Sequence, residues 1–325
     1  MKPIVITGAR GYIGAALARR LAGEGRALRL VSRPSSGSAG ALVGGANIEA
    51  IEADLCDETV WSRLLRDAAT IVHLSARTDL RAAEADPAGD EALNVEPVRA
   101  LVRAAANVGA RPDVVFASTV TIVGPQPAIP ADERTPDRPC SVYDRHKLAC
   151  ETILREATIA GTLAACTLRL SNVYGPGGAS VNSNRGILNV MMRRALGGEP
   201  LTIYGEGAYT RDFTHLDDVV VAFATAVDAG PEVRDGSHYV IATGQGHTLV
   251  EAYRLIVEDA FAATGRRVEI RHIAEPADLH PIERRNFIGN SSLYRGRTGW
   301  RPRIPLPEGI GRFFAAESSR LPVAR

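Results

Sequence analysis

Tyr143 and Lys147 are the two residues of this chain best placed for acid–base chemistry. Both fall in a predicted helix over Ser141–Gly161, where the i, i+4 spacing brings a phenol and an ammonium group to one face. A phenol with its ordinary pKa of about 10 exchanges protons poorly at neutral pH, and a fixed cation beside it lowers that pKa. Lys2 and Lys147 are the only lysines among 38 basic residues, so position 147 uses a compact, tunable charge where arginine is the rule.

Hydroxyl side chains end the predicted strand over Asp113–Thr119. That strand finishes with Ser118 and Thr119. The carboxyl ends of parallel strands border the crevice in which ligands of such sheets bind. A hydroxyl at this place can hold a carbonyl oxygen while Tyr143 protonates it. The combination therefore predicts interconversion of a ketone and an alcohol.

Three glycines stand between the first predicted strand, Ile4–Thr7, and a predicted helix over Tyr12–Gly23. Glycine permits a tight turn, lets the backbone approach a pyrophosphate and brings the helix close to the strand. The start of the helix then offers free N–H groups to the phosphates. We expect this turn to bind a dinucleotide through Gly8, Arg10, Gly11, Tyr12, Ile13 and Gly14.

The end of the second predicted strand, Ala27–Ser32, suggests which dinucleotide. NAD sites place an acidic residue there to hold the ribose hydroxyls, yet residues 25–48 contain no Asp or Glu. Ser32 and Arg33 occupy the position instead. A hydroxyl and a guanidinium suit a 2′-phosphate, so the sequence favours NADP(H), with NAD as the alternative.

Apolar strand-like runs alternate with amphipathic helical runs through the first half of the chain. This alternation predicts an α/β fold, a Rossmann-like doubly wound parallel sheet with helices on both faces. We expect residues 1–172 to form the NADP(H)-binding domain, with segments near 210–245 returning to it. Residues 173–325 are expected to form mainly a smaller α/β domain that binds the substrate. Besides the elements named above, we expect strands at Ile48–Leu55, Thr70–Ser75 and Thr167–Asn172, and helices at Glu58–Asp67 and Leu93–Asn107.

Several motifs in a fixed order resemble the extended short-chain dehydrogenases/reductases, the NAD(P)-dependent epimerase/dehydratase family. The resemblance spans nearly the whole chain, and it accounts for the glycine spacing T-G-x-x-G-x-x-G. The quoted motifs are the glycine turn, Asp54-Leu55, His73-Leu74-Ser75-Ala76, Asn94, Tyr143-x-x-x-Lys147, Leu168–Pro176, Arg211–Asp218 and Thr298–Pro302.

This resemblance implies a role for each matching residue. Thr119, Tyr143 and Lys147 would be the catalytic trio, with Ser118 as a further substrate contact. Asn172 and Arg211 would contact the diphosphate of a nucleotide sugar. Beyond the glycine turn, Ser32 and Arg33, the implied cofactor contacts are Asp54, Leu55, Leu74, Ser75, Ala76, Tyr143 and Lys147.

Two positions after Thr119 depart from related enzymes and narrow the reaction. The 4,6-dehydratases of the family carry an Asp-Glu pair there, and the decarboxylases carry a glutamate at the second position. This chain has Val120 and Thr121, which cannot supply that chemistry.

Two enzymatic hypotheses and one non-enzymatic hypothesis follow. In the first, the enzyme reduces the C4 ketone of a dTDP-4-keto-6-deoxyhexose with NADPH, and Tyr143 is the proton donor. This hypothesis is favoured by Ser32 and Arg33 at the end of the second strand and by a resemblance to the 4-ketoreductases of antibiotic deoxysugar pathways. The alternative is a UDP-hexose 4-epimerase with retained NAD. A non-catalytic NADP(H)-sensing regulator is less favoured, because such proteins lose the Tyr-x-x-x-Lys pair.

Composition excludes several other classes. The 325 residues carry a formal charge of +1 without acidic or basic blocks, which argues against nucleic acid as a partner. Four separated cysteines suggest neither a metal site nor disulfides, and no apolar run is long enough to cross a membrane. We expect a cytoplasmic enzyme, and the resemblance implies a homodimer formed through the helices at 93–107 and 141–161.

Overall fold

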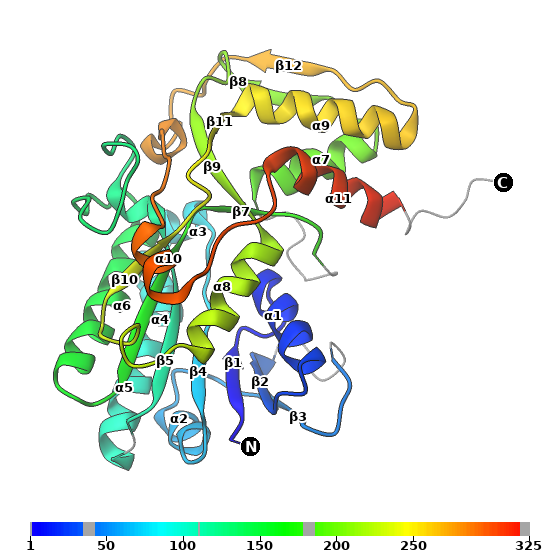
Figure 1. The fold of residues 1–325 in the computed structure, drawn as a ribbon. Coiled ribbons are helices and arrows are strands. Elements are labelled where there is room, and N and C mark those ends of the chain that lie inside the picture. Colours follow the sequence, from blue (N-terminus) through cyan, green and yellow to red (C-terminus); the bar gives the residue numbers. More distant parts are fainter. Residues whose placement is uncertain (1, 35–42, 110, 178–185, 319–325) are drawn as a thin grey trace.

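A seven-stranded sheet is the largest element of the computed structural model (Figure 1). The structure describes residues 2–34, 43–109, 111–177 and 186–318. All neighbouring strands of the sheet run parallel, in the order β10-β6-β5-β4-β1-β2-β3. This is the Rossmann-like doubly wound arrangement that the sequence predicted. The strands are β1 (Ile4–Thr7), β2 (Leu28–Ser32), β3 (Ile48–Glu52), β4 (Thr70–His73), β5 (Asp113–Thr119), β6 (Ala164–Leu170) and β10 (His238–Ile241).

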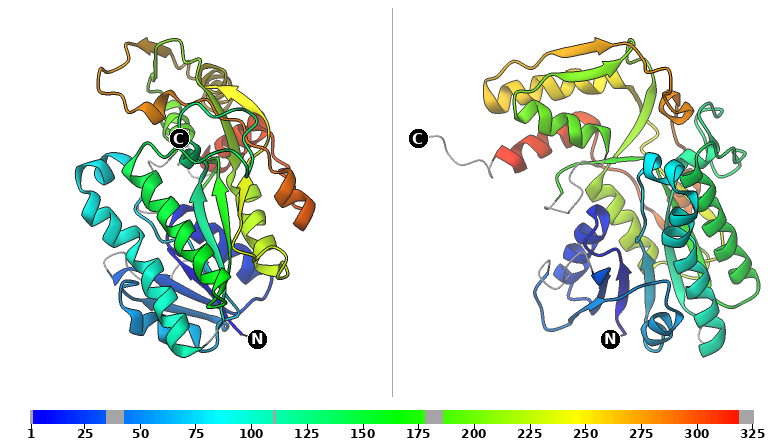
Figure 2. Two further views of the ribbon diagram at one scale, coloured as in Figure 1. Left: turned by 90° about the vertical axis from the view of Figure 1, so that its left-hand side faces the viewer. Right: turned by 180° about the vertical axis from the view of Figure 1, so that it is seen from behind.

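Helices cover both faces of this sheet (Figure 2), and an inner strand such as β1 accordingly has apolar side chains at successive positions. In β1, Ile4 and Ile6 pack into one buried cluster and Val5 into the other. Helices α1 (Tyr12–Gly23), α8 (Leu216–Asp228) and α10 (Ser292–Thr298) contribute to the first cluster. The second contains side chains of α2 (Glu58–Leu65), α5 (Glu96–Val108) and α6 (Val142–Ile159).

A smaller part of the molecule lies above the sheet in Figure 1 and has its own core. Strands β7 (Asn172–Tyr174), β9 (Thr210–His215) and β11 (Gly246–Thr248) form one small sheet, and β8 (Leu201–Tyr204) pairs with β12 (Ile270–Ile273). Helices α7 (Ile187–Leu196), α9 (Leu249–Thr264) and α11 (Leu306–Ser318) pack together there. The remaining elements are α3 (Leu80–Ala85), α4 (Pro87–Asn94) and the 3₁₀ turns η3 (Val120–Val123) and η4 (Pro281–Arg284).

The predicted helix at Leu93–Asn107 is wrong as a single element. The chain instead forms α4, which ends at Asn94, and a separate α5 from Glu96. Pro97 lies in the first turn of α5, where its missing N–H costs nothing, whereas inside a continuous helix it would remove a hydrogen bond.

Four strands also differ in their bounds from the predicted ones. Strand β2 begins one residue later than predicted, β3 ends at Glu52, and β4 ends at His73. Strand β6 begins three residues before Thr167, because Ala164 already pairs with β5. It ends at Leu170, and the chain then leaves the main sheet so that Asn172 pairs with β9. The strand β10 pairs with β6, so the chain returns to the main sheet after the small one.

Candidate active site

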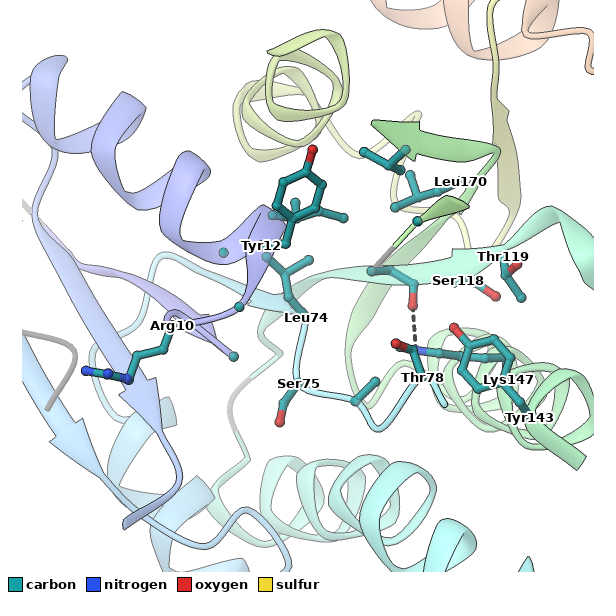
Figure 3. A pocket seen from close by; sticks show the side chains of 18 of the residues that line it. Arg10, Tyr12, Leu74, Ser75, Thr78, Ser118, Thr119, Tyr143, Lys147 and Leu170 are labelled. Atoms are coloured by element: carbon teal, nitrogen blue, oxygen red, sulfur yellow. Dashed lines mark hydrogen bonds between the residues drawn. The ribbon is translucent and has the colours of Figure 1, made fainter. Parts of the chain in front are cut away.

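A cavity of about 390 Å³ opens at the carboxyl ends of β1, β4 and β5, beside the start of α1 (Figure 3). This is where a doubly wound sheet reverses its strand order and binds ligands. The lining residues expected from the sequence are Gly8, Arg10, Gly11, Tyr12, Ile13, Gly14, Ser32, Arg33, Leu74, Ser75, Ala76, Ser118, Thr119, Tyr143 and Lys147. Those not expected are Thr78, Ala117, Leu170, Ser171, Val173 and Gly186.

The glycine turn is packed so closely that side chains are sterically excluded. Gly8 has φ of 66°, and a Cβ there would lie 2.8 Å from the Ser75 nitrogen. A Cβ on Gly14 would lie 2.3 Å from the Gly8 carbonyl oxygen. Gly11 is the N-cap of α1 and provides no side-chain cap, so the first N–H groups of the helix face the cavity side of the turn. A pyrophosphate fits this cradle.

The loop after β4 is held against the glycine turn by Thr7. The Thr7 hydroxyl accepts hydrogen bonds from the backbone N–H groups of Leu74 and Ser75, at 3.2 and 3.3 Å. Its oxygen also lies 2.8 Å from Nδ1 of His73. Burial, together with the charge of Lys147, lowers the pKa of His73 to about 3. His73 is therefore a neutral, structural residue whose bond to Thr7 fixes the wall of the cavity.

Lys147 is held rigidly beside Tyr143. Its side chain is 4% exposed, and Nζ donates a hydrogen bond of 2.9 Å to the carbonyl oxygen of Ala117 (Figure 3). The ammonium lies 4.6 Å from the centre of the Phe116 ring and 5.9 Å from that of Tyr143. Burial lowers the pKa of Lys147, and nearby acidic groups including Glu151 oppose that effect. Tyr143 and Thr119 both line the cavity next to this cation.

The two hydroxyls that end β5 have different partners. Ser118 donates its hydrogen to Glu151 at 2.5 Å, and Glu151 in turn forms a buried ion pair with Arg169. The Thr119 hydroxyl instead lies 2.8 Å from that of Thr121. Ser118 therefore ties the strand end to α6, whereas Thr119 contacts η3 through Thr121.

Asn172 and Arg211 lie in a second polar cluster, outside the lining of the cavity. Arg211 is 2% exposed and donates only to backbone carbonyls among its described contacts, those of Thr210, Glu283 and Arg285. Burial and the neighbouring Arg285 lower the pKa of Arg211 to about 9. Arg285 donates to Asn172 at 3.1 Å, and its buried Nε has no partner among the described residues. A buried guanidinium group and a half-buried one so close together suit a dianionic ligand such as a diphosphate.

At three residues the structure differs from the site predicted from the sequence. Asp54 and Leu55 do not line the cavity: Asp54 accepts a hydrogen bond from the Cys56 N–H, and Leu55 is buried. Arg285 was not predicted, because it lies 113 residues from Asn172 along the chain and in no recognised motif. Among the described residues, no group of three or more His, Cys, Asp or Glu could hold a metal ion.

The fold agrees with comparisons to known proteins. A profile of the NAD dependent epimerase/dehydratase family matches residues 4–242, and the chain belongs to that family. A UDP-glucose 4-epimerase of Thermotoga maritima and the protein MoeE5 share the α/β fold of this protein over 98% of the chain. No helix in the described part of the chain is long and apolar enough to cross a membrane.

Three relatives indicate the chemistry found on this scaffold. The chain is 30% identical to a UDP-glucose 4-epimerase of Mycolicibacterium smegmatis over 313 residues, covering 95% of this chain and 96% of the relative. A UDP-glucose 4-epimerase of Thermotoga maritima with UDP-glucose has a TM-score of 0.84 at 26% identity, covering 98% and 99% of the two chains. MoeE5, in complex with UDP-glucuronic acid and NAD, has a TM-score of 0.80 at 27% identity, covering 98% and 100%.

Proposed function

We propose that this protein is a nucleotide-sugar 4-epimerase that inverts C4 of a UDP-hexose and retains its nicotinamide cofactor. The observation that carries the proposal is one continuous arrangement: a dinucleotide cradle, then Thr119, Tyr143 and Lys147 along one cavity. The similarity to 4-epimerases supports the choice of reaction. It also favours NAD, with which MoeE5 was solved, and thus the second of the two hypotheses from the sequence.

The residues divide the work as follows. A bound nicotinamide ring supplies the acceptor, and later the donor, for the hydride at C4. Tyr143 takes the proton of the C4 hydroxyl and returns it after the ketone has turned its other face. Lys147 stabilises the phenolate form of Tyr143, and Thr119 aligns the C4 oxygen. Arg211 and Arg285 would hold the diphosphate while the sugar turns.

The proposal is tested by two measurements on the purified protein. Denaturation should release nicotinamide cofactor close to mole for mole, identified by chromatography as NAD or NADP. Without added cofactor, the native protein should interconvert UDP-glucose and UDP-galactose, or another pair of C4 epimers from a panel of UDP- and dTDP-sugars. A cofactor-free protein that converts no sugar of the panel would contradict the proposal.

A second candidate is NADPH-dependent reduction of a dTDP-4-keto-6-deoxyhexose. The observation that favours it is local: Ser32 and Arg33 line the cavity at the end of β2, where a carboxylate would suit NAD. A reductase exchanges its cofactor at every turnover, so it should consume NADPH mole for mole with the 4-keto sugar. This stoichiometry, in a protein that purifies without bound cofactor, would favour reduction over epimerisation.

A further inference from the structure

Behind Thr119, away from the cavity lining, a chain of hydrogen bonds leads to a buried carboxylate. The hydroxyl oxygens of Thr119 and Thr121 lie 2.8 Å apart. Thr121 donates its hydroxyl hydrogen to Oδ1 of Asp144 at 2.5 Å. Neither Thr121 nor Asp144 lines the cavity, and Asp144 is fully buried. Of the three residues in this series of hydrogen bonds, Thr119 alone lines the cavity.

A helix cap does not account for the Asp144 carboxylate. Asp144 lies in the first turn of α6, where an acidic side chain stabilises the helix dipole. Its backbone N–H donates to the N-cap Ser141, but its carboxylate contacts Thr121 of η3. The N-cap of α9 differs, because there Glu251 completes a reciprocal capping box with Thr248. The carboxylate of Asp144 therefore faces the catalytic strand end.

Only one oxygen of the Asp144 carboxylate has a hydrogen-bond partner among the described residues. Its second oxygen, Oδ2, is buried and has no hydrogen-bond partner among the described residues. A charged group near Asp144 is Arg285, which follows η4. Burial lowers the pKa of Arg285, and the Asp144 carboxylate partly opposes that effect. Just before α6, the Cys140 thiol has its pKa raised by burial and by the Asp144 carboxylate, so Asp144 acts electrostatically on that side as well. Burying a carboxylate oxygen without a hydrogen bond costs free energy of folding. A catalytic role is one reason why a protein keeps such a group.

The hydrogen positions in this chain follow from the donors available. An ionised carboxylate only accepts, so Thr121 gives its single hydroxyl hydrogen to Asp144. Thr121 can then only accept from Thr119, because two oxygens 2.8 Å apart need a hydrogen between them. The Thr119 oxygen also accepts the backbone N–H of Thr121 at 3.2 Å, so one of its two lone pairs is left to accept the hydrogen of a substrate hydroxyl.

We propose that Thr121 and Asp144 form a proton relay behind Thr119, which gives the proton of the C4 hydroxyl a second acceptor besides Tyr143. The inference rests on the proposed function, in which a C4 hydroxyl is oxidised beside Thr119. The C4 proton would pass to Thr119, the Thr119 proton to Thr121 and the Thr121 proton to Asp144; a bound nicotinamide would accept the hydride from C4. Each hydroxyl again carries one hydrogen, and Asp144 becomes a carboxylic acid. Reduction of the ketone reverses every transfer.

The test compares Thr121→Val, which cuts the relay at nearly constant volume, with Thr121→Ser, which keeps the hydroxyl. For the epimerisation, Thr121→Val should lower kcat about tenfold, leave KM for the nucleotide sugar within about twofold, and reduce the solvent deuterium isotope effect on kcat. Thr121→Ser should recover most of the rate and the isotope effect. Asp144→Asn should resemble Thr121→Val, and the double variant should be no slower than either single one. Thr264→Val on α9 is the matched control and should match the wild type.

The outcomes separate the relay from the proposed function. An active wild type with an unchanged kcat and isotope effect in both Thr121→Val and Asp144→Asn would overturn the relay alone. A loss confined to KM, or equal losses in Thr121→Val and Thr121→Ser, would likewise reject it in favour of a packing role. A wild type that epimerises no nucleotide sugar would refute the proposed function, and the relay with it.

Discussion

At the scale of single residues, the roles of the hydroxyl groups in the site depend on their hydrogen-bond partners. Ser118 and Thr119 are neighbours in the sequence, yet one binds Glu151 and the other Thr121. Neighbouring side chains of a strand point to opposite faces, so only contacts across the fold distinguish them. The pattern of hydroxyls in the sequence could therefore place both near the substrate, but it could not assign their partners.

Tyr143→Phe tests the proton transfer most simply. The variant lacks the phenolic hydrogen but keeps the ring, so kcat for C4 conversion should fall by at least about 100-fold. Bound cofactor should be retained within a few-fold of the wild type, as measured after denaturation. Tyr204→Phe on β8 is the control and should keep full activity. Near wild-type turnover of Tyr143→Phe would remove Tyr143 from the mechanism.

Arg33→Ala tests the choice between the two dinucleotides. If Arg33 binds a 2′-phosphate, its loss removes a charge-assisted hydrogen bond, and Kd for NADPH should rise at least about tenfold. Kd for NADH should change less than about twofold, since NADH has no 2′-phosphate. Arg26→Ala, which removes an ion pair with Asp228 on the exposed surface, should change neither constant. Equal weakening of both cofactors by Arg33→Ala would show that Arg33 does not distinguish them.

At the scale of elements, the turn between β1 and α1 is where close packing and function coincide. Replacing glycine by alanine inside a helix usually stabilises it, by up to about 1 kcal/mol. At Gly14 the sign should reverse, because the new Cβ would meet the Gly8 carbonyl oxygen at 2.3 Å. Gly14→Ala should lower Tm and abolish cofactor retention, both measurable on one preparation.

The control for Gly14→Ala lies on the same helix. A Cβ on Gly23 would meet nothing within 4 Å, so Gly23→Ala should leave cofactor retention intact and Tm equal or slightly higher. A Gly14→Ala protein that keeps its cofactor would contradict the close approach on which the cradle depends.

The elements nearest the cofactor cradle were the easiest to predict from sequence. The bounds of β1, α1 and β5 agree with the predicted ones, because each is a short run with a clear apolar period and a clear stop. The break between α4 and α5 was missed although Pro97 marks it. Arg285 could not be predicted, since it reaches Asn172 only through the packing of the chain after η4 against β7 and β9.

At the scale of the whole molecule, the cavity is lined by strand ends of the main sheet and by Val173 of β7. The smaller part of the molecule lies above that sheet (Figure 1). The cofactor cradle belongs to β1 and α1, whereas Arg211 lies on β9 of the small sheet. Asp212 is fully buried and accepts hydrogen bonds from Thr243, Gly244 and Gly289, which fixes β9 to two later segments. The proposed diphosphate site would therefore be assembled from chain segments far apart in sequence, since Arg285 lies 113 residues beyond Asn172.

A homodimer formed by α5 and α6 remains a prediction. Leu101 and Ala105 are fully buried in the core, so the available surface is the half-buried stripe that includes Ala149 and Ile153 on α6. Light scattering should give twice the chain mass of 34.6 kDa for the wild type. Ala149→Arg should give the monomer mass, and Phe261→Arg on α9 should not. A monomeric wild type would refute this interface.

The most direct test of the central claim follows the hydrogen at C4. In the proposed reaction that hydrogen leaves the sugar as hydride and returns to the opposite face without meeting solvent. UDP-glucose labelled with deuterium at C4, incubated in ordinary water without added cofactor, should give UDP-galactose that keeps the deuterium at C4, as read by NMR and mass spectrometry. Replacement of the label by solvent hydrogen, or conversion only when NADPH is supplied, would contradict epimerisation by a retained nicotinamide.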